Sequence, residues 1–244
     1  MLTQTDTQWG GITIITKLPA SESATNSTQL LRLLQLSSAA LPVGGYSFSQ
    51  GLEYAIDTGW IKTDTHVADW VSLLMHESLA QVDLPLLQRL IHAQHTNNPE
   101  QTTYWNAYTL ACRETSELRL TDTAMGDALM RLLKQLDIPV HPPAKETSFL
   151  TAFAATAHHW QIDTHNTCVG FLWSWLENQI AAATKLVPLG QTSAQKLLVQ
   201  LGDELPAVLE KAAQIDDENI GSSLPGLAMA SSWHETQYSR LFRS

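Results

Sequence analysis

Apolar side chains recur at intervals of three and four residues along most of the chain, which is the spacing of one face of an α-helix. The alternating pattern of a half-buried strand is nearly absent after residue 27. The pattern therefore predicts an all-α fold, a single-domain helical bundle of about eight to ten helices. The expected helical segments begin at Thr28 and continue at 47–56, from Asp64 past Pro85, in two series within 99–138, and at 149–160, 169–180 and 197–208.

Proline and glycine residues predict where these helices end. Pro42 and the pair at 44–45 break the first helix, and adjacent glycines suit a tight turn with positive φ. Pro85 predicts a bend or break in the long segment that Asp64 caps. Pro206 predicts a break or a fresh helix start within the last apolar series.

Residues 1–27 differ from the rest of the chain. They contain adjacent glycines at 10–11, a short β-prone run at 12–15 and a patch rich in Ser, Thr and Asn. We expect them to form a flexible or partner-ordered N-terminal extension. Residues 28–244 then form the all-α domain. The chain does not begin with a charged segment followed by an apolar run, so we expect no signal peptide.

The charge balance and the cysteines narrow the class of partner and the compartment. The 24 acidic residues outnumber the 14 basic ones, which gives a formal net charge of −10, and no run of Lys or Arg is present. Such a chain repels phosphate backbones and anionic lipid, so we expect no nucleic acid and no membrane as partners. Cys112 and Cys168 form no CxxC pair, which favours reduced thiols in the cytoplasm.

The sequence contains no convincing catalytic constellation. Gly-x-Gly, Gly-Lys, HExxH and ExxH are all missing, so nucleotide-phosphate loops and the common helical zinc and di-iron sites are not predicted. We therefore assign no catalytic residue, no metal ligand and no tightly bound cofactor. His92 and His95 are spaced to share a helix face, which leaves one alternative: a small helical metal-dependent enzyme with an unrecognised site.

Two segments are unusual for simple helix connections. Residues 41–53 read LPVGGYSFSQGLE, in which Tyr46 and Phe48 offer large rigid contact area beside polar groups. The chain ends in YSRLFRS at 238–244, an aromatic and arginine-rich tail in an acidic protein. This composition predicts that the tail docks. The alternative is an amphipathic last turn that only covers the core.

Four segments resemble the UreF family of urease accessory proteins, namely 41–53, 112–133, 185–195 and 231–244, and the resemblance extends from about residue 28 to the end. It implies an all-α fold, a homodimer and no enzymatic activity. It further implies a role in nickel delivery to apo-urease, through binding of a UreD-type (also called UreH-type) accessory protein and recruitment of a UreG-type GTPase. Modulation of GTP hydrolysis and transient passage of nickel through an internal channel are also implied.

The resemblance carries over to individual residues. Tyr46 and Arg240 match the glycine-turn and SRLF motifs and are the best candidates for the GTPase-facing surface. Arg113 and Glu114 match a RET-type motif, in which an ion pair would fix helix packing or face the partner. Gly190 would cap a helix C-terminus. The expected partner-binding residues are Tyr46, Ser47, Phe48, Glu53, Arg113, Glu114, Lys185, Gly190, Gln191, Ser239, Arg240, Leu241, Phe242 and Arg243.

Overall fold

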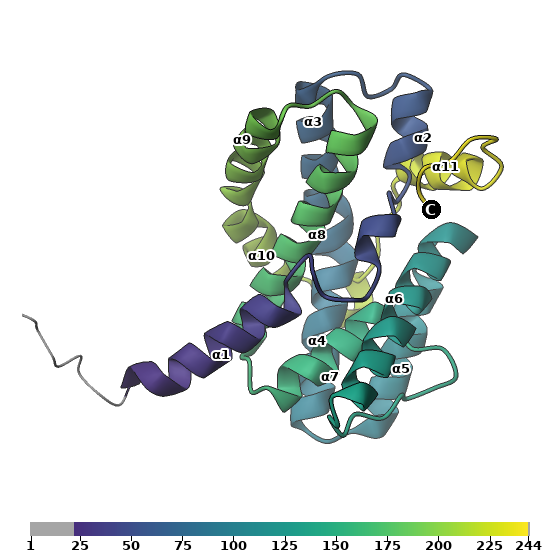
Figure 1. The fold of residues 1–244 in the computed structure, drawn as a ribbon. Helices are drawn as coiled ribbons and strands as arrows, with labels where there is room; N and C mark the ends of the chain where they lie inside the picture. Colours follow the sequence, from purple (N-terminus) through teal and green to yellow (C-terminus); the bar gives the residue numbers. More distant parts are fainter. Residues whose placement is uncertain (1–21, 244) are drawn as a thin grey trace, which may run out of the picture.

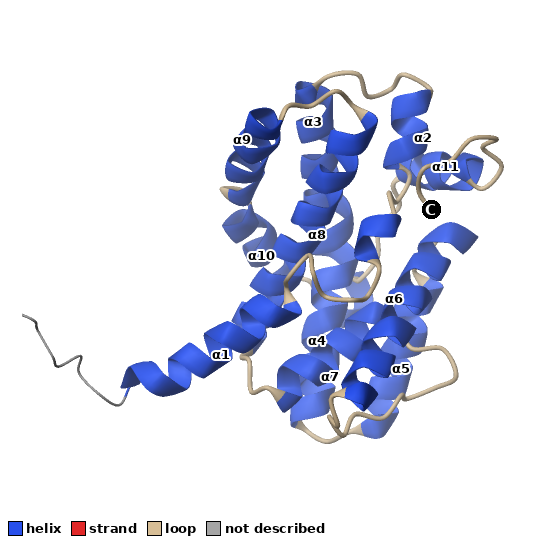
Figure 2. Ribbon diagram, in the orientation of Figure 1, coloured by secondary structure: helices blue, strands red, loops and turns tan. Residues whose placement is uncertain are grey.

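The computed structural model describes residues 22–243, which are helical over most of their length (Figures 1 and 2). This part of the chain contains no strand, so the predicted all-α class is confirmed. A π-helical segment, Met75–Asp83, joins α3 to α4, and short 3-10 turns cover Gly45–Ser47 and Asp217–Asn219. The α-helices are α1 (Glu22–Leu36), α2 (Leu52–Asp57), α3 (Asp64–Leu74), α4 (Leu84–His95), α5 (Pro99–Ala111), α6 (Ser116–Gln135), α7 (Phe149–His159), α8 (Thr164–Leu186), α9 (Gln191–Gly202), α10 (Leu205–Ala213) and α11 (Pro225–His234).

Helices α4 and α8 form the centre of the bundle. α4 packs against α5, α7, α8 and α10, and α8 also packs against α1, α2, α3 and α9. Figure 1 shows α5, α6 and α7 at one end of the molecule and α2, α3 and α9 at the other. Leu87 and Leu90 of α4 and Leu172 and Leu176 of α8 are fully buried. Burial of each such side chain contributes about 1.5–3 kcal/mol, so these two helices fix the frame on which the other elements are placed.

The chain remains helical from Asp64 to His95, through Pro85. In an α-helix, proline removes one hydrogen bond and its ring clashes with the carbonyl four residues earlier. Here the preceding residues are already in a π-helical register, since the N–H of Leu84 donates to the carbonyl of Leu79. This register admits the proline ring, so of the bend or break expected at Pro85 the break does not occur. The N-cap is Thr63 rather than Asp64, because the Thr63 side chain accepts from the N–H of His66.

The start of the first helix also differs from the predicted one, whereas a later predicted start is confirmed. α1 begins at Glu22 rather than at Thr28, so the expected limit of the N-terminal extension at residue 27 falls inside a helix. The β-prone run at 12–15 lies outside the described residues. The fresh start predicted near Pro206 is confirmed, because α10 begins at Leu205.

The helix predicted at 47–56 is only partly formed. Residues 41–53, which we call the glycine turn, contain a 3-10 turn at Gly45–Ser47, and α2 starts only at Leu52. The helix begins later than predicted because Gln50 and Gly51 have φ angles of 53° and 81°, which cannot continue a right-handed helix. The positive φ expected at the paired glycines is found at Gly44, at 76°.

Gly126 of α6 provides a test of this packing. A Cβ atom at this position would overlap the carbonyl oxygen of Thr147 and approach the carbonyl carbon of Ser148, where α7 begins. We expect Gly126→Ala to lower the free energy of unfolding by about 1–3 kcal/mol, measured by urea denaturation, because backbone must move to make room.

The matched control is Gly202→Ala in α9. Its added Cβ would meet only Trp173, at an ordinary contact distance of 3.8 Å. Since alanine is the better helix former, this variant should be neutral or stabilised by up to about 1 kcal/mol. Equal effects of the two substitutions would contradict the close packing of α6 on the start of α7.

Candidate partner-binding surface

The segments at 41–53, 112–133, 185–195 and 231–244 are far apart in sequence, yet each supplies side chains to one region of the molecule. In Figure 1 the C-terminus lies beside α2 and α11, next to the end of α6. We call residues 238–243 the docked tail.

The docked tail is hydrogen-bonded to the glycine turn through its backbone. The N–H groups of Leu241 and Phe242 donate to the two carboxylate oxygens of Glu53, at 2.6 and 2.9 Å. The N–H of Arg243 donates to the carbonyl of Ser47 at 2.8 Å. Three consecutive backbone groups are therefore satisfied within the chain, although terminal residues usually fray.

Four ionisable side chains meet beneath the docked tail: Glu53 of α2, Glu117 of α6, His234 of α11 and Arg240 of the tail. We call them the charged quartet. The His234 side chain is 0% exposed, with Nδ1 at 2.8 Å from Glu117 Oε2 and Nε2 at 2.9 Å from Glu53 Oε2. Arg240 Nη1 donates to Glu117 Oε1 at 2.9 Å. The quartet therefore joins three helices to the tail.

Sequence reasoning found Glu53 and Arg240 but missed Glu117 and His234. Both missed residues lie inside segments that had been singled out, CRETSE and SSWHETQ. A single sequence carries no signal that pairs them, because 117 residues separate the two side chains. A fully buried histidine needs partners for its polar atoms, and only the fold shows which carboxylates supply them.

Above the quartet lies an exposed face that combines aromatic and cationic side chains. The Lys185 ammonium lies 5.9 Å from the centre of the Tyr46 ring and 5.4 Å from that of Phe242, within range of a cation–π interaction. Tyr46 and Leu241 are 63% and 65% exposed. We define the tail–turn surface as the exposed residues Tyr46, Lys185, Arg240, Leu241 and Arg243.

The fourteen expected partner-binding residues separate into three groups by burial. Phe48, Glu53 and Phe242 are buried, so the expectation that Phe48 offers contact area to a partner is corrected: its ring packs inside, under the guanidinium of Arg243 at 5.7 Å. Ser47 and Arg113 are partly buried. The exposed residues are Tyr46, Glu114, Lys185, Gly190, Gln191, Ser239, Arg240, Leu241 and Arg243.

Arg113 forms a second buried ionic group. Its Nη2 donates to Asp83 at 2.8 Å and its Nε donates to Asp122 at 2.9 Å. Burial by itself would lower the pKa of the guanidinium, but the carboxylates of Asp122 and Asp83 outweigh it and raise that pKa. Glu114, the next residue of the motif, is exposed and accepts from the hydroxyl of Ser223. Arg113 therefore fixes the end of the π-helical segment to α6.

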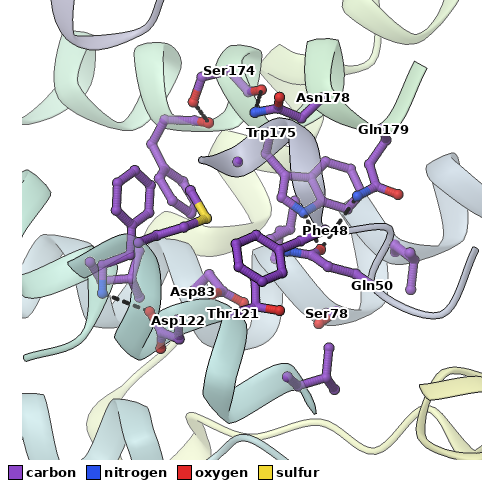
Figure 3. Close-up of a pocket in the computed structure, with 18 of the residues that line it drawn as sticks. Phe48, Gln50, Ser78, Asp83, Thr121, Asp122, Ser174, Trp175, Asn178 and Gln179 are labelled. Atoms are coloured by element: carbon purple, nitrogen blue, oxygen red, sulfur yellow. Dashed lines mark hydrogen bonds between the residues drawn. The ribbon is translucent and has the colours of Figure 1, made fainter. Parts of the chain in front are cut away.

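A cavity lies between this ionic group and the underside of the glycine turn. Figure 3 shows Phe48 and Gln50 projecting between the α8 side chains and the carboxylates of Asp83 and Asp122. Trp175 Nε1 donates to Gln50 Oε1 at 2.8 Å, which fixes one wall. The cavity wall also includes Cys112, Arg113, Ser174, Asn178 and Gln179. The cavity thus combines apolar walls with several oxygen and nitrogen groups.

Cys112 presents a protonated thiol at this wall. Burial is the main cause that raises the pKa of Cys112, Arg113 lowers it in part, and Asp83 and Glu114 raise it further. A thiol in this state is a poor metal ligand and a weak nucleophile. Within residues 22–243 we find no group of three or more His, Cys, Asp or Glu side chains arranged to hold a metal ion.

The two histidines of the alternative metal hypothesis do not face a carboxylate cluster. His92 and His95 are both exposed in the last turn of α4. The ring of His95 lies 5.1 Å from that of His158, at the end of α7. Burial, followed by the charges of His95 and His159, lowers the pKa of His158. The arrangement is a pair of neighbouring imidazoles at two helix ends.

The loop at 185–195 has a different role from the one expected. Gly190 is the N-cap of α9, with φ at −69°, and a Cβ there would meet nothing within 4 Å. The predicted C-cap role is therefore wrong, since that role needs a left-handed residue after a helix. Gln191 is the first residue of α9, and Lys185 lies in the last turn of α8, where it reaches the tail–turn surface.

The fold and this region define an all-α protein whose C-terminal tail packs back onto a glycine-containing turn. The UreF family profile matches residues 61–202. This chain therefore belongs to the UreF family of urease accessory proteins. None of the helices described within 22–243 combines the length and apolar character needed to cross a membrane.

Individual relatives match nearly the whole chain. The urease accessory protein UreF of Marinomonas sp. (strain MWYL1) is 55% identical over 223 residues, covering 90% of this chain and 96% of the relative. The UreF of Hahella chejuensis is 49% identical over 217 residues, 88% of this chain and 98% of the relative. That of Pseudomonas entomophila is 48% identical over 218 residues, 88% and 97% respectively.

Arg113→Met tests the second ionic group. The substitution leaves Asp83 and Asp122 buried without their cation, so we expect the free energy of unfolding to fall by about 3–5 kcal/mol. Asp83→Asn should also destabilise the protein, but less, because one charge pair remains. Urea denaturation followed by circular dichroism measures both.

The matched control is Glu146→Gln. Glu146 pairs with Arg119 at the surface, where both side chains are exposed to water. Loss of this surface ion pair should lower the free energy of unfolding by less than about 1 kcal/mol. If Arg113→Met cost no more than this control, the guanidinium would not be needed to neutralise the two buried carboxylates.

Proposed function

We propose that this chain is a non-enzymatic maturation factor that bridges a UreD/UreH-type accessory protein and a UreG-type GTPase, so that nickel reaches apo-urease. Membership of the UreF family supports a role in urease maturation, and the relatives are named as urease accessory proteins. The observation that carries the bridging role is the tail–turn surface. Contact there modulates GTP hydrolysis by the recruited GTPase.

The tail–turn surface has the composition of a binding site. It places three of the 14 basic residues beside two exposed apolar side chains, on a chain with a net charge of −10. Aromatic residues and arginine are enriched in protein interfaces, where a few large side chains supply most of the binding energy. The local positive charge favours a partner that presents carboxylates or phosphate groups.

The residues below the surface support this assignment by their rigidity. The backbone of the docked tail is bonded to Glu53 and Ser47, and Phe242 is buried beneath Lys185. A binding surface that is ordered before the partner arrives loses less conformational entropy on association. The tail–turn surface is therefore pre-organised for binding.

Nickel is cargo under this proposal, and no cofactor is tightly bound. The cavity of Figure 3 carries Asp83, Asp122 and Gln50, whose oxygen atoms can contact a passing cation. The protein works in the cytoplasm as a homodimer. It binds neither nucleic acid nor membrane, which agrees with its excess of acidic residues.

The experiment that tests the bridge is gel filtration with light scattering. The chain is mixed with the UreD/UreH-type protein, the UreG-type GTPase and guanine nucleotide. Co-elution of all three as a stoichiometric assembly supports the proposal. If every partner is folded and no association occurs, the bridging role is rejected.

Tyr46→Ala and Leu241→Asp test the tail–turn surface itself. Both side chains are mostly exposed, so their loss should leave the thermal unfolding midpoint nearly unchanged. We expect each to weaken GTPase association at least about tenfold, as loss of an interface residue that carries binding energy does. Calorimetric titration measures the affinity.

The control is Val199→Asp, at a position on α9 that is 67% exposed and lies outside the surface. It should leave the affinity unchanged. Arg240→Ala is less informative, because Arg240 also pairs with buried Glu117 and its loss mixes stability with binding. Unaltered affinity in both Tyr46→Ala and Leu241→Asp would place the partner elsewhere.

A further inference from the structure

The charged quartet requires a particular protonation state of His234. Both of its ring nitrogens lie within hydrogen-bonding distance of a carboxylate oxygen, and the side chain is fully buried. An ionised carboxylate only accepts hydrogen bonds, and a neutral imidazole donates through one nitrogen only. If Glu53 and Glu117 are both ionised, His234 must donate through both nitrogens, as an imidazolium.

The other bonds of the quartet engage three of the four carboxylate oxygens as acceptors. Both oxygens of Glu53 accept backbone N–H groups, those of Leu241 and Phe242. Glu117 Oε1 accepts from Arg240, and Glu117 Oε2 lies 2.8 Å from His234 Nδ1. A proton on any of the first three oxygens would displace one of these donors, so the position of the remaining proton is decided between Glu117 Oε2 and His234.

Charge balance leads to the same state. Two ionised carboxylates face one guanidinium, so one further proton is needed to bring the net charge of the group to zero. An imidazole is ordinarily more basic than a carboxylate, so this proton is placed on His234 rather than on an acid. The other charged side chains nearby are Glu235, which accepts from the hydroxyl of Ser116, and Arg243, which lies over Phe48. Both are exposed and screened by water, so they cannot balance a charge buried between α2, α6 and α11.

We propose that His234 is a positioning residue, held as an imidazolium, and that its second proton keeps the docked tail in place. Without that proton, a nitrogen lone pair faces a carboxylate oxygen at less than 3 Å, and Glu53 and Glu117 repel each other. The bonds from Glu53 to the tail backbone are then lost. The effect on partner binding rests on the proposed function, whereas the position of the tail does not.

The first test measures protonation and tail position together in the full chain. Nitrogen-15 spectra of the histidine side chains distinguish an imidazolium from either neutral tautomer. Hydrogen exchange reports whether the N–H groups of Leu241 and Phe242 remain bonded. As the pH is raised, we expect the imidazolium signature of His234 and the protection of these two amides to disappear together, while amides of α4 stay protected.

The outcome that overturns the proposal is equally direct. A neutral His234 coexisting with protected amides at Leu241 and Phe242 would show that the second proton is not needed. Glu117→Gln offers a conservative variant that retains size and hydrogen bonding. It removes one negative charge, so the imidazolium signature should disappear at lower pH than in the wild-type chain. An unchanged signature would also overturn the proposal.

A double variant separates charge from shape. We expect His234→Gln to speed exchange at Leu241 and Phe242 at least about tenfold, because two carboxylates then share one guanidinium. Adding Glu117→Gln leaves Glu53 as the one carboxylate of the group, balanced by the one guanidinium of Arg240, so protection should partly return. A further loss in the double variant would assign His234 a merely steric role. Glu235→Gln, at the exposed C-cap residue that follows α11, is the control and should change neither readout.

Failure of this inference can be told apart from failure of the proposed function. If His234→Gln releases the tail and the GTPase still binds with full affinity, the positioning role stands and the tail–turn surface is not the binding site. If the tail stays docked in His234→Gln while Tyr46→Ala and Leu241→Asp lose binding, the surface stands and the role of His234 is rejected.

Discussion

Two buried carboxylates, those of Glu53 and Glu117, impose the constraint on which the functional end of the molecule depends. A buried negative charge costs several kcal/mol unless it is paired and hydrogen-bonded. Neither helix that carries these residues provides its own counter-charge. The side chains that face them are those of His234 at the end of α11 and Arg240 beyond it, and backbone N–H groups of the tail complete the shell. Satisfying these two groups therefore fixes where the last residues of the chain lie.

The same principle organises the interior between the π-helical segment, α6 and α7. Arg113 neutralises Asp83 and Asp122, and Asp122 also accepts the N–H of Phe149 at the start of α7. Each ionic group includes one carboxylate from α6: Glu117 in the charged quartet and Asp122 in the group around Arg113. The cavity lies between Arg113 and the glycine turn. The glycine turn therefore contributes Phe48 to the cavity wall and Tyr46 to the exposed tail–turn surface.

Local errors of prediction had local physical causes. Pro85 does not end the helix, since the residues before it adopt a π-helical register that periodicity cannot show. α2 starts late because Gln50 as well as Gly51 has positive φ, a conformation that glutamine rarely adopts. Gly190 begins a helix instead of ending one, and a glycine beside a proline-containing loop is compatible with both roles. In each case the residue type allowed two conformations and the surrounding packing selected one.

The sequence by itself determined the all-α class, most helix positions and the segments that matter, because helical periodicity and motif composition are local properties. It also pointed to Tyr46, Lys185 and Arg240 through the motifs that contain them. Only the tertiary structure decided that Phe48 faces inward, that Arg113 pairs with Asp83 across 30 residues, and that His234 lies between two carboxylates. These pairings join residues that are distant along the chain. They are selected by the cost of leaving a charge unpaired in the interior, which no local pattern records.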